Sequence, residues 1–294
     1  MKNTTRLRAH LASGKQLIAP GVANALNARL VRQHGFDAVY MTGAGTSAVR
    51  LGMPDIGLLT MTEMIDNAAR IVDASGLPLI ADADNGYGGV MNVRRTVQGY
   101  VRAGVAGIHL EDQVFPKRCG HLAGKSVIPV DEMVAKIKAA VDARDDPDFL
   151  LIARTDAIAV EGFDAAIERA HRYKEAGADA LFVEAPNLAQ LRMIPGKLQG
   201  PLLFNMASSG KTPFLEQGEI KALGFQIIIY PNWVILAAIR AANHVLSMLK
   251  QDGNMGRLSE EVATFREFFD ILGMSEVQSL EARYQVDEGS RVGY

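Results

Sequence analysis

The sequence predicts a (β/α)8 barrel of the TIM type, in the α/β class, because two patterns alternate along its 294 residues. Eight short runs rich in Val, Ile and Leu alternate with longer amphipathic stretches. Runs that are apolar at successive positions are typical of parallel strands buried on both faces. Eight strand–helix repeats within about 250 residues have the size and rhythm of such a barrel.

The predicted strands are all short and apolar. They are Leu17–Ala19, Ala38–Thr42, Pro78–Asp82, Gly107–Glu111, Phe149–Arg154, Ala180–Glu184, Pro201–Asn205 and Gln226–Tyr230. Between them, stretches such as Asp131–Arg144 and Phe163–Ala176 place apolar residues at helical spacing. Glycine, the usual residue after a helix, follows these stretches at positions 35, 76, 104, 177 and 224.

We expect one domain over residues 1–294, since no linker rich in Pro, Gly or Ser divides the chain. The barrel takes up residues from about 15 to 250, and a helical extension and tail follow from 251 to 294. The extension is predicted to hold a helix from Arg257 to Leu272. The polar, aperiodic residues at the end of the chain predict a loose terminus.

Composition excludes several classes of protein. Apolar residues make up 48% of the chain, and the net charge is −2, so neither disorder nor binding to nucleic acid or an anionic membrane is expected. The single cysteine excludes a disulfide framework and fits a reducing compartment. No signal peptide or membrane-spanning run is evident, which predicts a cytoplasmic protein.

Charged and polar side chains stand at the ends of successive predicted strands. They are Asp82, Asp84, His109, Glu111, Arg154, Glu184 and Asn205. In such a barrel, reacting groups come from the carboxyl ends of strands. Each carboxylate alone has an alternative role as a helix cap or a partner of an arginine. Together, Asp82, Asp84 and Glu111 offer hard oxygen ligands, which favour Mg²⁺ or Mn²⁺ over Zn²⁺. Without a cation, these acids would repel one another, and we expect His109 to contact substrate.

A second group of reactive residues follows the fourth strand, in the run Lys117-Arg118-Cys119-Gly120-His121. Nearby prolines and glycines predict a loop, long enough to act as a lid. Lys, Arg and His beside the only thiol stabilise its thiolate, which permits proton exchange near neutral pH. Most single cysteines are buried and inert among apolar neighbours, whereas Cys119 has charged neighbours. We therefore interpret Cys119 as functional.

The segment Gly43-Ala44-Gly45-Thr46-Ser47-Ala48 fits a dinucleotide-binding pattern that requires a helix to open there. Gly52 and Pro54 leave no room for that helix, so we do not expect nucleotide binding. The backbone amides of Thr42, Gly43 and Ala44 are instead candidates for holding a carboxylate.

Taken together, these motifs resemble the isocitrate lyase and phosphoenolpyruvate mutase superfamily, over nearly the whole chain. The Lys-Arg-Cys-Gly-His run is the signature of its carbon–carbon lyase branch, and Glu111-Asp112-Gln113, Asp82-Ala83-Asp84 and Val160-Glu161-Gly162 are similar to the methylisocitrate lyases within it. The resemblance implies cleavage of a 2-hydroxy di- or tricarboxylate into an α-keto acid and a second carboxylate.

The resemblance also implies the roles of individual residues. Asp82, Asp84 and Glu111 would lie around Mg²⁺, or Mn²⁺, directly or through water. Cys119 would protonate the departing carbanion, assisted by Lys117, Arg118 and His121, while Tyr40 or a nearby ionised group would remove the hydroxyl proton. The residues expected around the substrate are Thr42, Gly43, Ala44, Asp55, His109, Arg154, Glu184 and Asn205. The implied assembly is a homotetramer whose eighth barrel helix is exchanged between subunits.

Two segments depart from the methylisocitrate lyase pattern. Thr42-Gly43-Ala44-Gly45 stands where that group has Ser-Gly-Gly-Gly. Asn205-Met206-Ala207-Ser208 stands where it has Asn-Ile-Thr-Glu, and the Gly-Lys-Thr-Pro of residues 210–213 is more similar to alkylmalate lyases. The predicted substrate is therefore 2-methylisocitrate or a 2-alkylmalate such as 2,3-dimethylmalate.

Two other functions are compatible with the same barrel. One is an oxaloacetate decarboxylase or hydrolase, or a carboxyphosphonoenolpyruvate phosphonomutase; such relatives generally lack the Lys-Arg-Cys-Gly-His loop. The other is an inactive homologue that only binds keto acids, which should have lost one of the acids or the thiol. Because the chain keeps all of these groups, we expect a lyase.

Overall fold

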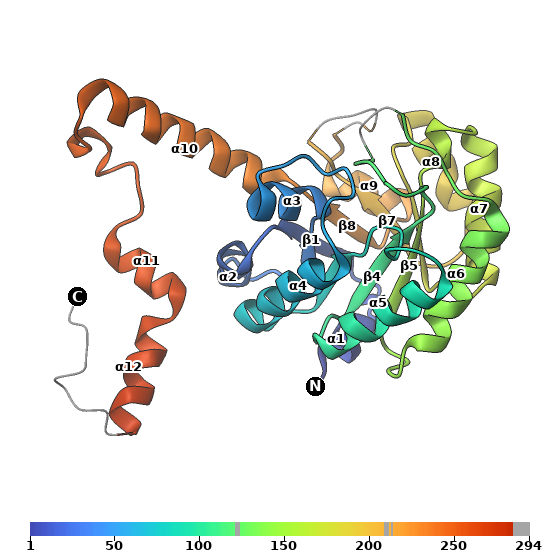
Figure 1. The fold of residues 1–294 in the computed structure, drawn as a ribbon, viewed down its shortest axis with the longest axis horizontal. Helices are drawn as coiled ribbons and strands as arrows, with labels where there is room; N and C mark the ends of the chain where they lie inside the picture. Colours follow the sequence, from blue (N-terminus) through green and yellow to red (C-terminus); the bar gives the residue numbers. More distant parts are fainter. Residues whose placement is uncertain (121–123, 209–211, 213, 285–294) are drawn as a thin grey trace. The chain divides into compact units, whose positions relative to one another are not determined.

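A computed structural model places eight parallel strands in one closed barrel, in the order of the sequence (Figure 1). The structure describes residues 1–120, 124–208, 212 and 214–284. The strands are β1 (Leu17–Val22), β2 (Val39–Met41), β3 (Leu79–Asp82), β4 (Gly107–Glu111), β5 (Leu150–Thr155), β6 (Ala180–Val183), β7 (Leu202–Asn205) and β8 (Ile227–Tyr230). Every neighbouring pair is parallel, and β1 closes the barrel against β8 from Leu17↔Ile227 to Pro20↔Tyr230. The predicted fold class is confirmed.

Each of the eight predicted apolar runs overlaps one strand, with ends that differ by up to three residues. The largest shift is in β1, which continues through Pro20 and Gly21 to Val22. A Cβ atom built on Gly21 would overlap the backbone of Pro231, so only glycine allows the chain after β8 to approach β1 this closely.

Helices follow the strands and cover the barrel. They are α2 (Ala25–Gln33), α3 (Gly43–Leu51), α4 (Met61–Ser75), α5 (Val90–Arg102), α6 (Val130–Ala143), the 3-10 turn η1 (Ala157–Ala159), α7 (Phe163–Glu175), α8 (Leu188–Lys197) and α9 (Gln217–Leu223). The five predicted glycine stops all have positive φ, from 60° at Gly76 to 108° at Gly177. A reciprocal cap between Thr60 and Glu63 starts α4.

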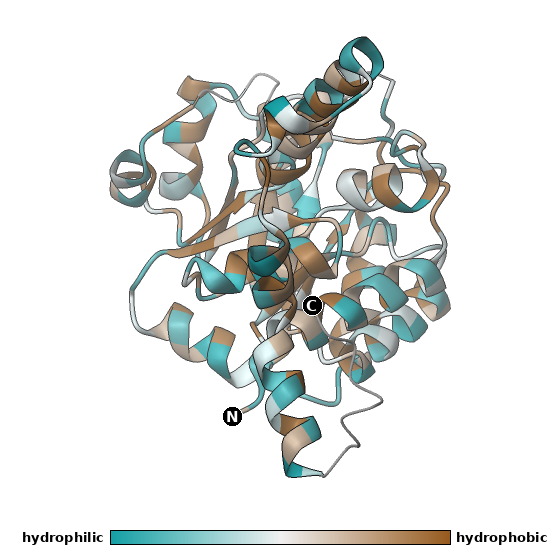
Figure 2. Cartoon of the chain, turned by 90° about the vertical axis from the view of Figure 1, so that its left-hand side faces the viewer, coloured by the Kyte–Doolittle hydropathy of each residue, from teal (hydrophilic) through white to brown (hydrophobic). Residues whose placement is uncertain are grey.

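Alternate residues of each strand face the two sides of the barrel wall. In β5, Leu150 and Ile152 pack inside the barrel, whereas Leu151 and Ala153 pack against the helices. Figure 2 shows the apolar strands in the middle and helices that alternate hydrophobic and hydrophilic residues along their length. The strands are buried on both faces, as their apolar sequences predicted.

One helix contradicts the sequence analysis. Gly52 and Pro54 were expected to leave no room for a helix after β2, but α3 runs there from Gly43 to Leu51. Thr42 caps its start by accepting a hydrogen bond from the Gly45 amide, and Gly52 ends it with φ of 63°. Nine residues suffice because Gly52 can turn the chain in the left-handed region. The helix α1 (Asn3–Ala12) precedes the barrel and was not predicted.

The chain divides into two compact units, Met1–Leu236 and Ala237–Tyr294. The helix α10 (Trp233–Asp252) spans this boundary, and the single-domain organisation stays a prediction. The expected helix from Arg257 to Leu272 is only partly correct: a 3-10 turn, η2 (Gly256–Leu258), is followed by α11 (Phe265–Leu272). Thr264 and Glu267 form a reciprocal cap that starts a new helix there.

The expected loose terminus is also partly wrong, because α12 (Met274–Arg283) occupies its first half. Gly273, with φ of 85°, ends α11 and leads directly into α12. Within the described part of the chain, no helix has the length and apolarity needed to cross a membrane.

Candidate active site

The carboxyl ends of the strands surround one small cavity of about 40 Å³. Most of the residues predicted to act at the site line it: Tyr40, Thr42, Ala44, Asp55, Asp82, Glu111, Lys117, Cys119, Arg154, Glu184 and Asn205. Gly120, Pro231 and Asn232 complete the lining. The structure therefore brings the loop with the thiol and the acids of β3 and β4 into one cavity.

The acid pair after β3 is held by the backbone. Asp82 Oδ1 accepts a hydrogen bond of 2.9 Å from the Asp84 amide, and its Oδ2 accepts one of 3.2 Å from the Gly43 amide. Asp84 adopts a positive φ of 47°, which aspartate tolerates better than most residues. The turn Asp82-Ala83-Asp84 thus directs two carboxylates into the end of the barrel, and both are at least 95% buried.

Lys117 is the cation that joins these acids. Its Nζ lies 2.6 Å from Asp84 Oδ1 and 2.7 Å from Asp55 Oδ1, and its side chain is only 3% exposed. Burial lowers the pKa of Lys117, but Asp84 and Asp82 raise it well above its ordinary value. The acids thus already have one cation between them, because a lysine from the loop after β4 supplies a positive charge. We call Asp82, Asp84, Glu111 and Lys117 the β3–β4 cluster.

In the β3–β4 cluster, Glu111 Oε1 is buried and accepts no hydrogen bond from the described part of the chain, whereas Asp84 Oδ1 is paired with Lys117 Nζ. Burial raises the pKa of Asp84 to about 7, since Lys117 only partly offsets it, and Asp82 raises it further. No three His, Cys, Asp or Glu side chains among the described residues stand close enough to form a metal site by themselves. Mg²⁺ usually takes one or two carboxylates and keeps several waters, so the open oxygen of Glu111, together with the carboxylates of Asp82 and Asp84, fits that ion.

Arg154 forms a second group with the residues around β5. Its Nε and Nη2 lie 2.9 Å and 3.1 Å from the Asp156 carboxylate, and its Nη1 lies 3.4 Å from Glu111 Oε2. Lys125 Nζ lies 2.7 Å from Asp156 Oδ1. Burial raises the pKa of Asp156, but Arg154 and Lys125 lower it to about 2. We call Arg154, Asp156 and Lys125 the β5 cluster.

Glu184 and Asn205 lie beside Arg154 at the ends of β6 and β7. Glu184 Oε2 is 4.0 Å from Arg154 Nη2 and accepts a hydrogen bond of 3.3 Å from Asn205 Nδ2. The guanidinium of Arg154 also stacks over the ring of Phe182, at 5.0 Å from its centroid. Arg154 is therefore fixed on three sides and can face a substrate carboxylate on the fourth.

Tyr40, which lines the cavity, forms a neutral pair with His109, which does not line it. The Tyr40 hydroxyl lies 2.8 Å from His109 Nε2, and both side chains are buried. Burial lowers the pKa of His109 to about 4, so the ring is uncharged near pH 7. Burial, followed by Asp82, raises the pKa of Tyr40 well above its ordinary value. Tyr40 is thus a hydrogen-bonding group rather than an ionised base in this arrangement.

The loop after β4 is held at three points. The Cys119 amide donates a hydrogen bond of 3.1 Å to the Asp55 carbonyl. The Gln113 side chain accepts from the Arg118 amide and donates to the Arg118 carbonyl. A Cβ atom built on Gly120 would overlap Arg154 Nη2 and lie 2.7 Å from Glu184 Oε1. The thiol of Cys119 therefore belongs to a segment packed closely against the site.

The remaining predicted residues differ in their placement. Gly43 and Ala44 begin α3, but the Gly43 amide already donates to Asp82. The Ala44 amide, in the first turn of the helix, has no acceptor within the helix and is the better candidate for holding a carboxylate. Arg118 is exposed and does not line the cavity. His121 lies outside the described residues.

The sequence analysis assigned no role at the site to Asn232, Asp156 or Lys125. Asn232 Oδ1 accepts a hydrogen bond of 2.9 Å from the Thr42 hydroxyl. It follows the end of β8, so the rule applied to the other strand ends would have found it. Asp156 follows β5 in the same way. Lys125 carries no such signal, because it lies on a loop far from any strand end.

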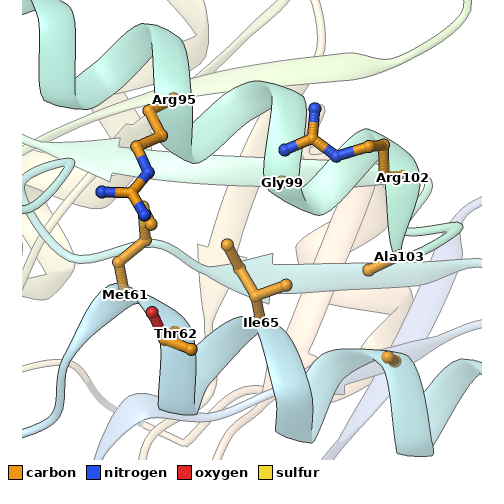
Figure 3. A pocket seen from close by; sticks show the side chains of 8 residues that line it. Met61, Thr62, Ile65, Arg95, Gly99, Arg102 and Ala103 are labelled. Carbon is orange, nitrogen blue, oxygen red and sulfur yellow. The ribbon is translucent and has the colours of Figure 1, made fainter.

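A second cavity, of about 380 Å³, lies on the surface between α4 and α5 (Figure 3). Met61, Thr62 and Ile65 line it from α4, and Arg95 and Arg102 project from α5. None of the residues predicted to act at the site lines it. It is a shallow groove between helices and does not belong to the site at the end of the barrel.

The chain is similar to known proteins over almost its whole length. The chain is 47% identical to the 2,3-dimethylmalate lyase of Eubacterium barkeri over 97% of its own length and 99% of that protein. It is 42% identical to the 2-methylisocitrate lyase of Shewanella oneidensis over 91% and 92% of the two lengths. A solved structure of oxaloacetate acetylhydrolase with the inhibitor 3,3-difluorooxalacetate matches with a TM-score of 0.93, 38% identity and 98% of both chains.

The family model described as phosphoenolpyruvate phosphomutase matches residues 7–250. That match extends from α1 through the whole barrel and most of α10, and so includes both clusters and the loop with Cys119. The two relatives named above from Eubacterium barkeri and Shewanella oneidensis are lyases, as the Lys-Arg-Cys-Gly-His loop and the acids after β3 and β4 indicated. The chain belongs to the phosphoenolpyruvate phosphomutase family.

Proposed function

We propose that this chain is a carbon–carbon lyase that cleaves a 2-hydroxy carboxylate into an α-keto acid, such as pyruvate, and a second carboxylate. The observation that carries the proposal is the position of Cys119, which lines the same cavity as Asp82, Glu111 and Arg154. A proton donor, carboxylates suited to a cation and a fixed arginine are the groups that such a cleavage needs.

The substrate's carboxylates face positive groups of the site. Arg154 is oriented by Asp156, Glu184 and the Phe182 ring, so that it binds an anion with little further ordering. The Ala44 amide at the start of α3 offers an N–H donor where the helix dipole favours negative charge. These groups lie on opposite sides of the barrel end, on β5 and after β2, which sets the orientation of a bound hydroxy acid.

The reaction moves two protons and one electron pair. A base removes the proton of the 2-hydroxyl, and the oxygen forms the keto carbonyl. The electron pair of the broken C–C bond passes to the carbon next to the carboxyl group of the departing fragment. Cys119 gives its S–H proton to that carbon, and solvent restores the thiol. The raised pKa of Tyr40 makes it a hydrogen-bond donor to the hydroxyl oxygen, and the base is one of the ionised carboxylates beside it.

Mg²⁺, or Mn²⁺ in its place, would be held by the carboxylates of Asp82, Asp84 and Glu111, directly or through water, and would supply Lewis-acid polarisation of the substrate's oxygens. The chain's own contribution is to keep Glu111 Oε1 buried and without a hydrogen-bond donor among the described residues. Lys117 balances the negative charge of Asp84 and Asp55, and it keeps Asp55 next to the loop of Cys119.

Among the substrates, we favour a dicarboxylate such as 2,3-dimethylmalate over the tricarboxylate 2-methylisocitrate. Lys117 and Arg154 are the basic side chains among the cavity lining, and two carboxylates already share Lys117. At the end of β7, Asn205 is turned to Glu184 and offers no charge for a third carboxylate. The higher identity to a 2,3-dimethylmalate lyase agrees with this choice.

The test is an assay of 2,3-dimethylmalate, other 2-alkylmalates and 2-methylisocitrate, with Mg²⁺ and with EDTA, that follows release of the keto acid. We expect Mg²⁺-dependent pyruvate release, fastest with a 2-alkylmalate. Cys119→Ser should lower kcat by roughly 100- to 10,000-fold, because a hydroxyl is a far weaker acid than a thiol. No keto acid from any of these substrates, with correctly folded protein, would contradict the proposal.

A second candidate is an oxaloacetate hydrolase or decarboxylase, which the likeness to oxaloacetate acetylhydrolase favours. The same assay with oxaloacetate distinguishes it, since consumption of oxaloacetate would exceed that of any alkylmalate. A decarboxylation does not need a thiol, so in that case Cys119→Ser would keep its activity.

We further infer a homotetramer with the helix after β8 exchanged between subunits, and a cytoplasmic location. The helix α11 supports an assembly, because Phe265 and Phe268 on it are 65% and 42% exposed. Sedimentation of the whole protein measures the subunit number, and a monomer at micromolar concentration would contradict the inference.

A further inference from the structure

Lys125 has a buried ammonium group for which the proposed reaction gives no role. Its side chain is 3% exposed, and its Nζ lies 2.5 Å from the Gly120 carbonyl and 2.7 Å from Asp156 Oδ1. A buried charge is stable only when it is paired and hydrogen-bonded, so these two contacts are strongly favoured over separation. They connect the loop after β4 to the end of β5.

The β5 end of this connection is well anchored. The carboxylate of Asp156 also accepts two hydrogen bonds from Arg154, and the Asp156 amide donates one of 2.9 Å to Asp112 Oδ1. Asp112 is itself fully buried and accepts from the hydroxyls of Thr155 and Tyr173. Lys125 therefore attaches to a part of the wall that has few ways to move.

The other end of the connection lies next to the thiol. Gly120 follows Cys119 directly, and its Cα is packed against the Arg154 guanidinium and the Glu184 carboxylate. On the opposite side, the Cys119 amide is bonded to the Asp55 carbonyl. The loop is thus attached before Cys119 by Asp55, which also pairs with Lys117, and after Cys119 by Lys125.

We propose that Lys125 is a positioning residue that fixes the backbone at Gly120 and thereby holds the Cys119 thiol at the cavity. It does so through Asp156, the carboxylate that also orients Arg154. One buried anion then sets the position of the proton donor and of the cation that faces the substrate. The proposal rests on the proposed function for its consequence in catalysis, but not for the attachment itself.

The test uses the fact that Cys119 is the only thiol of the chain. The rate of its alkylation by iodoacetamide is measured at pH 9.5, where an ordinary thiol is ionised and the rate reports access. We expect Lys125→Met to raise this rate about 10- to 100-fold, the range expected for loss of a charged hydrogen bond. Lys125→Arg should stay near the unmodified protein, because it keeps both contacts.

Lys174→Met is the matched control. Lys174 also donates to two backbone carbonyls, those of Ala178 and Asp179, but it lies on α7 away from the cavity. We expect no change in alkylation rate for this variant. If Lys125→Met unfolds, Lys125→Gln is used, since it keeps a shorter N–H donor and should give an intermediate rate.

An alkylation rate for folded Lys125→Met or Lys125→Gln equal to that of the unmodified protein would overturn the proposal. An equal increase in Lys174→Met would also overturn it, because the effect would then be a general loosening. Alkylation needs no turnover, so these results stand even where the proposed lyase activity fails. With an active substrate, we expect Lys125→Met to lower kcat about tenfold or more while KM changes little.

Discussion

Two clusters at the end of the barrel use the same residue types and are completed to different degrees. In the β5 cluster, both oxygens of Asp156 accept hydrogen bonds from Arg154, and one of them also pairs with Lys125. In the β3–β4 cluster, Asp84 Oδ1 is paired with Lys117, but Glu111 Oε1 accepts no hydrogen bond within the described residues. The two clusters lie only one strand apart, and Arg154 reaches both.

This difference separates carboxylates that stabilise the fold from carboxylates that are available to bind a ligand. A buried carboxylate whose oxygens are all occupied is stable and has nothing left to offer a ligand. A buried carboxylate with an orphaned oxygen is costly to fold but ready for a cation or a substrate. The pKa values agree in direction, since that of Asp156 is lowered to about 2 and that of Asp84 is raised to about 7.

The largest expected effect on stability comes from Asp156→Asn. It leaves Arg154 and Lys125 as buried cations with one anion fewer, and breaking such a pair lowers the free energy of unfolding by about 3–5 kcal/mol. Urea unfolding measures the loss. Asp66→Asn is the control, because Asp66 also pairs with two arginines but is 39% exposed, and its loss should be much smaller. Equal losses in the two variants would show that burial does not distinguish them.

Glu111→Gln should have the opposite effect: the stability is kept and activation by the metal is weakened. The pKa of Glu111 is raised well above its ordinary value by burial, so a neutral amide of the same shape folds as well or better. Activation by Mg²⁺ should weaken by about 100-fold or more, because the orphaned oxygen loses its charge. Turnover against Mg²⁺ concentration, together with urea unfolding, measures both effects. A large loss of stability would place Glu111 with the residues that hold the fold.

The pH dependence of stability sharpens the comparison, because ionisation of Asp156 and ionisation of Asp84 change the free energy of unfolding in opposite directions. The folded pKa of Asp156 is below its ordinary value, so its contribution is present above about pH 4 and is lost as pH falls towards 2. The folded pKa of Asp84 is above its ordinary value, so its unfavourable contribution begins near pH 4 and is complete above about pH 7.

In metal-free buffer, Asp84→Asn should therefore raise the free energy of unfolding at pH 8 and leave it nearly unchanged at pH 4. The gain should grow through the interval between those values. Unfolding in urea at a series of pH values measures it, with EDTA present throughout. A gain that is the same at pH 4 and pH 8 would mean that the charge of Asp84 is not its source.

The smallest effect is expected at Asn232, which belongs to neither cluster. Asn232→Ala removes the acceptor of the Thr42 hydroxyl, a net change of about 1 kcal/mol for one neutral hydrogen bond. Because Thr42 also caps α3, which begins with Gly43 and Ala44, the affinity for oxalate should fall a few-fold. Calorimetric titration with oxalate measures this change. An unchanged affinity would show that the start of α3 does not take part in binding oxalate.

The fold was largely predictable from local patterns. Each apolar run became a strand and each predicted glycine stop took up positive φ, because burial on both faces and chain reversal leave a direct trace in neighbouring residues. The errors arose where a local cap overrode the pattern: Thr42 started α3 and Thr264 started α11. Such caps depend on one hydrogen bond and leave a weaker trace than a long apolar stripe.

The acids at the strand ends and the cysteine beside basic residues could also be identified from the sequence, since their types and positions point to their chemistry. Their partners could not. Lys117 meets Asp55 across 62 positions, Thr42 meets Asn232 across 190, and Lys125 meets Asp156 across 31. No local pattern records these pairs, because parallel strands collect their carboxyl ends at one rim only after the barrel closes. The sequence by itself determined which groups would gather there, while closure of β1 against β8 and the packing of the loops decided which carboxylates are satisfied and which stay open.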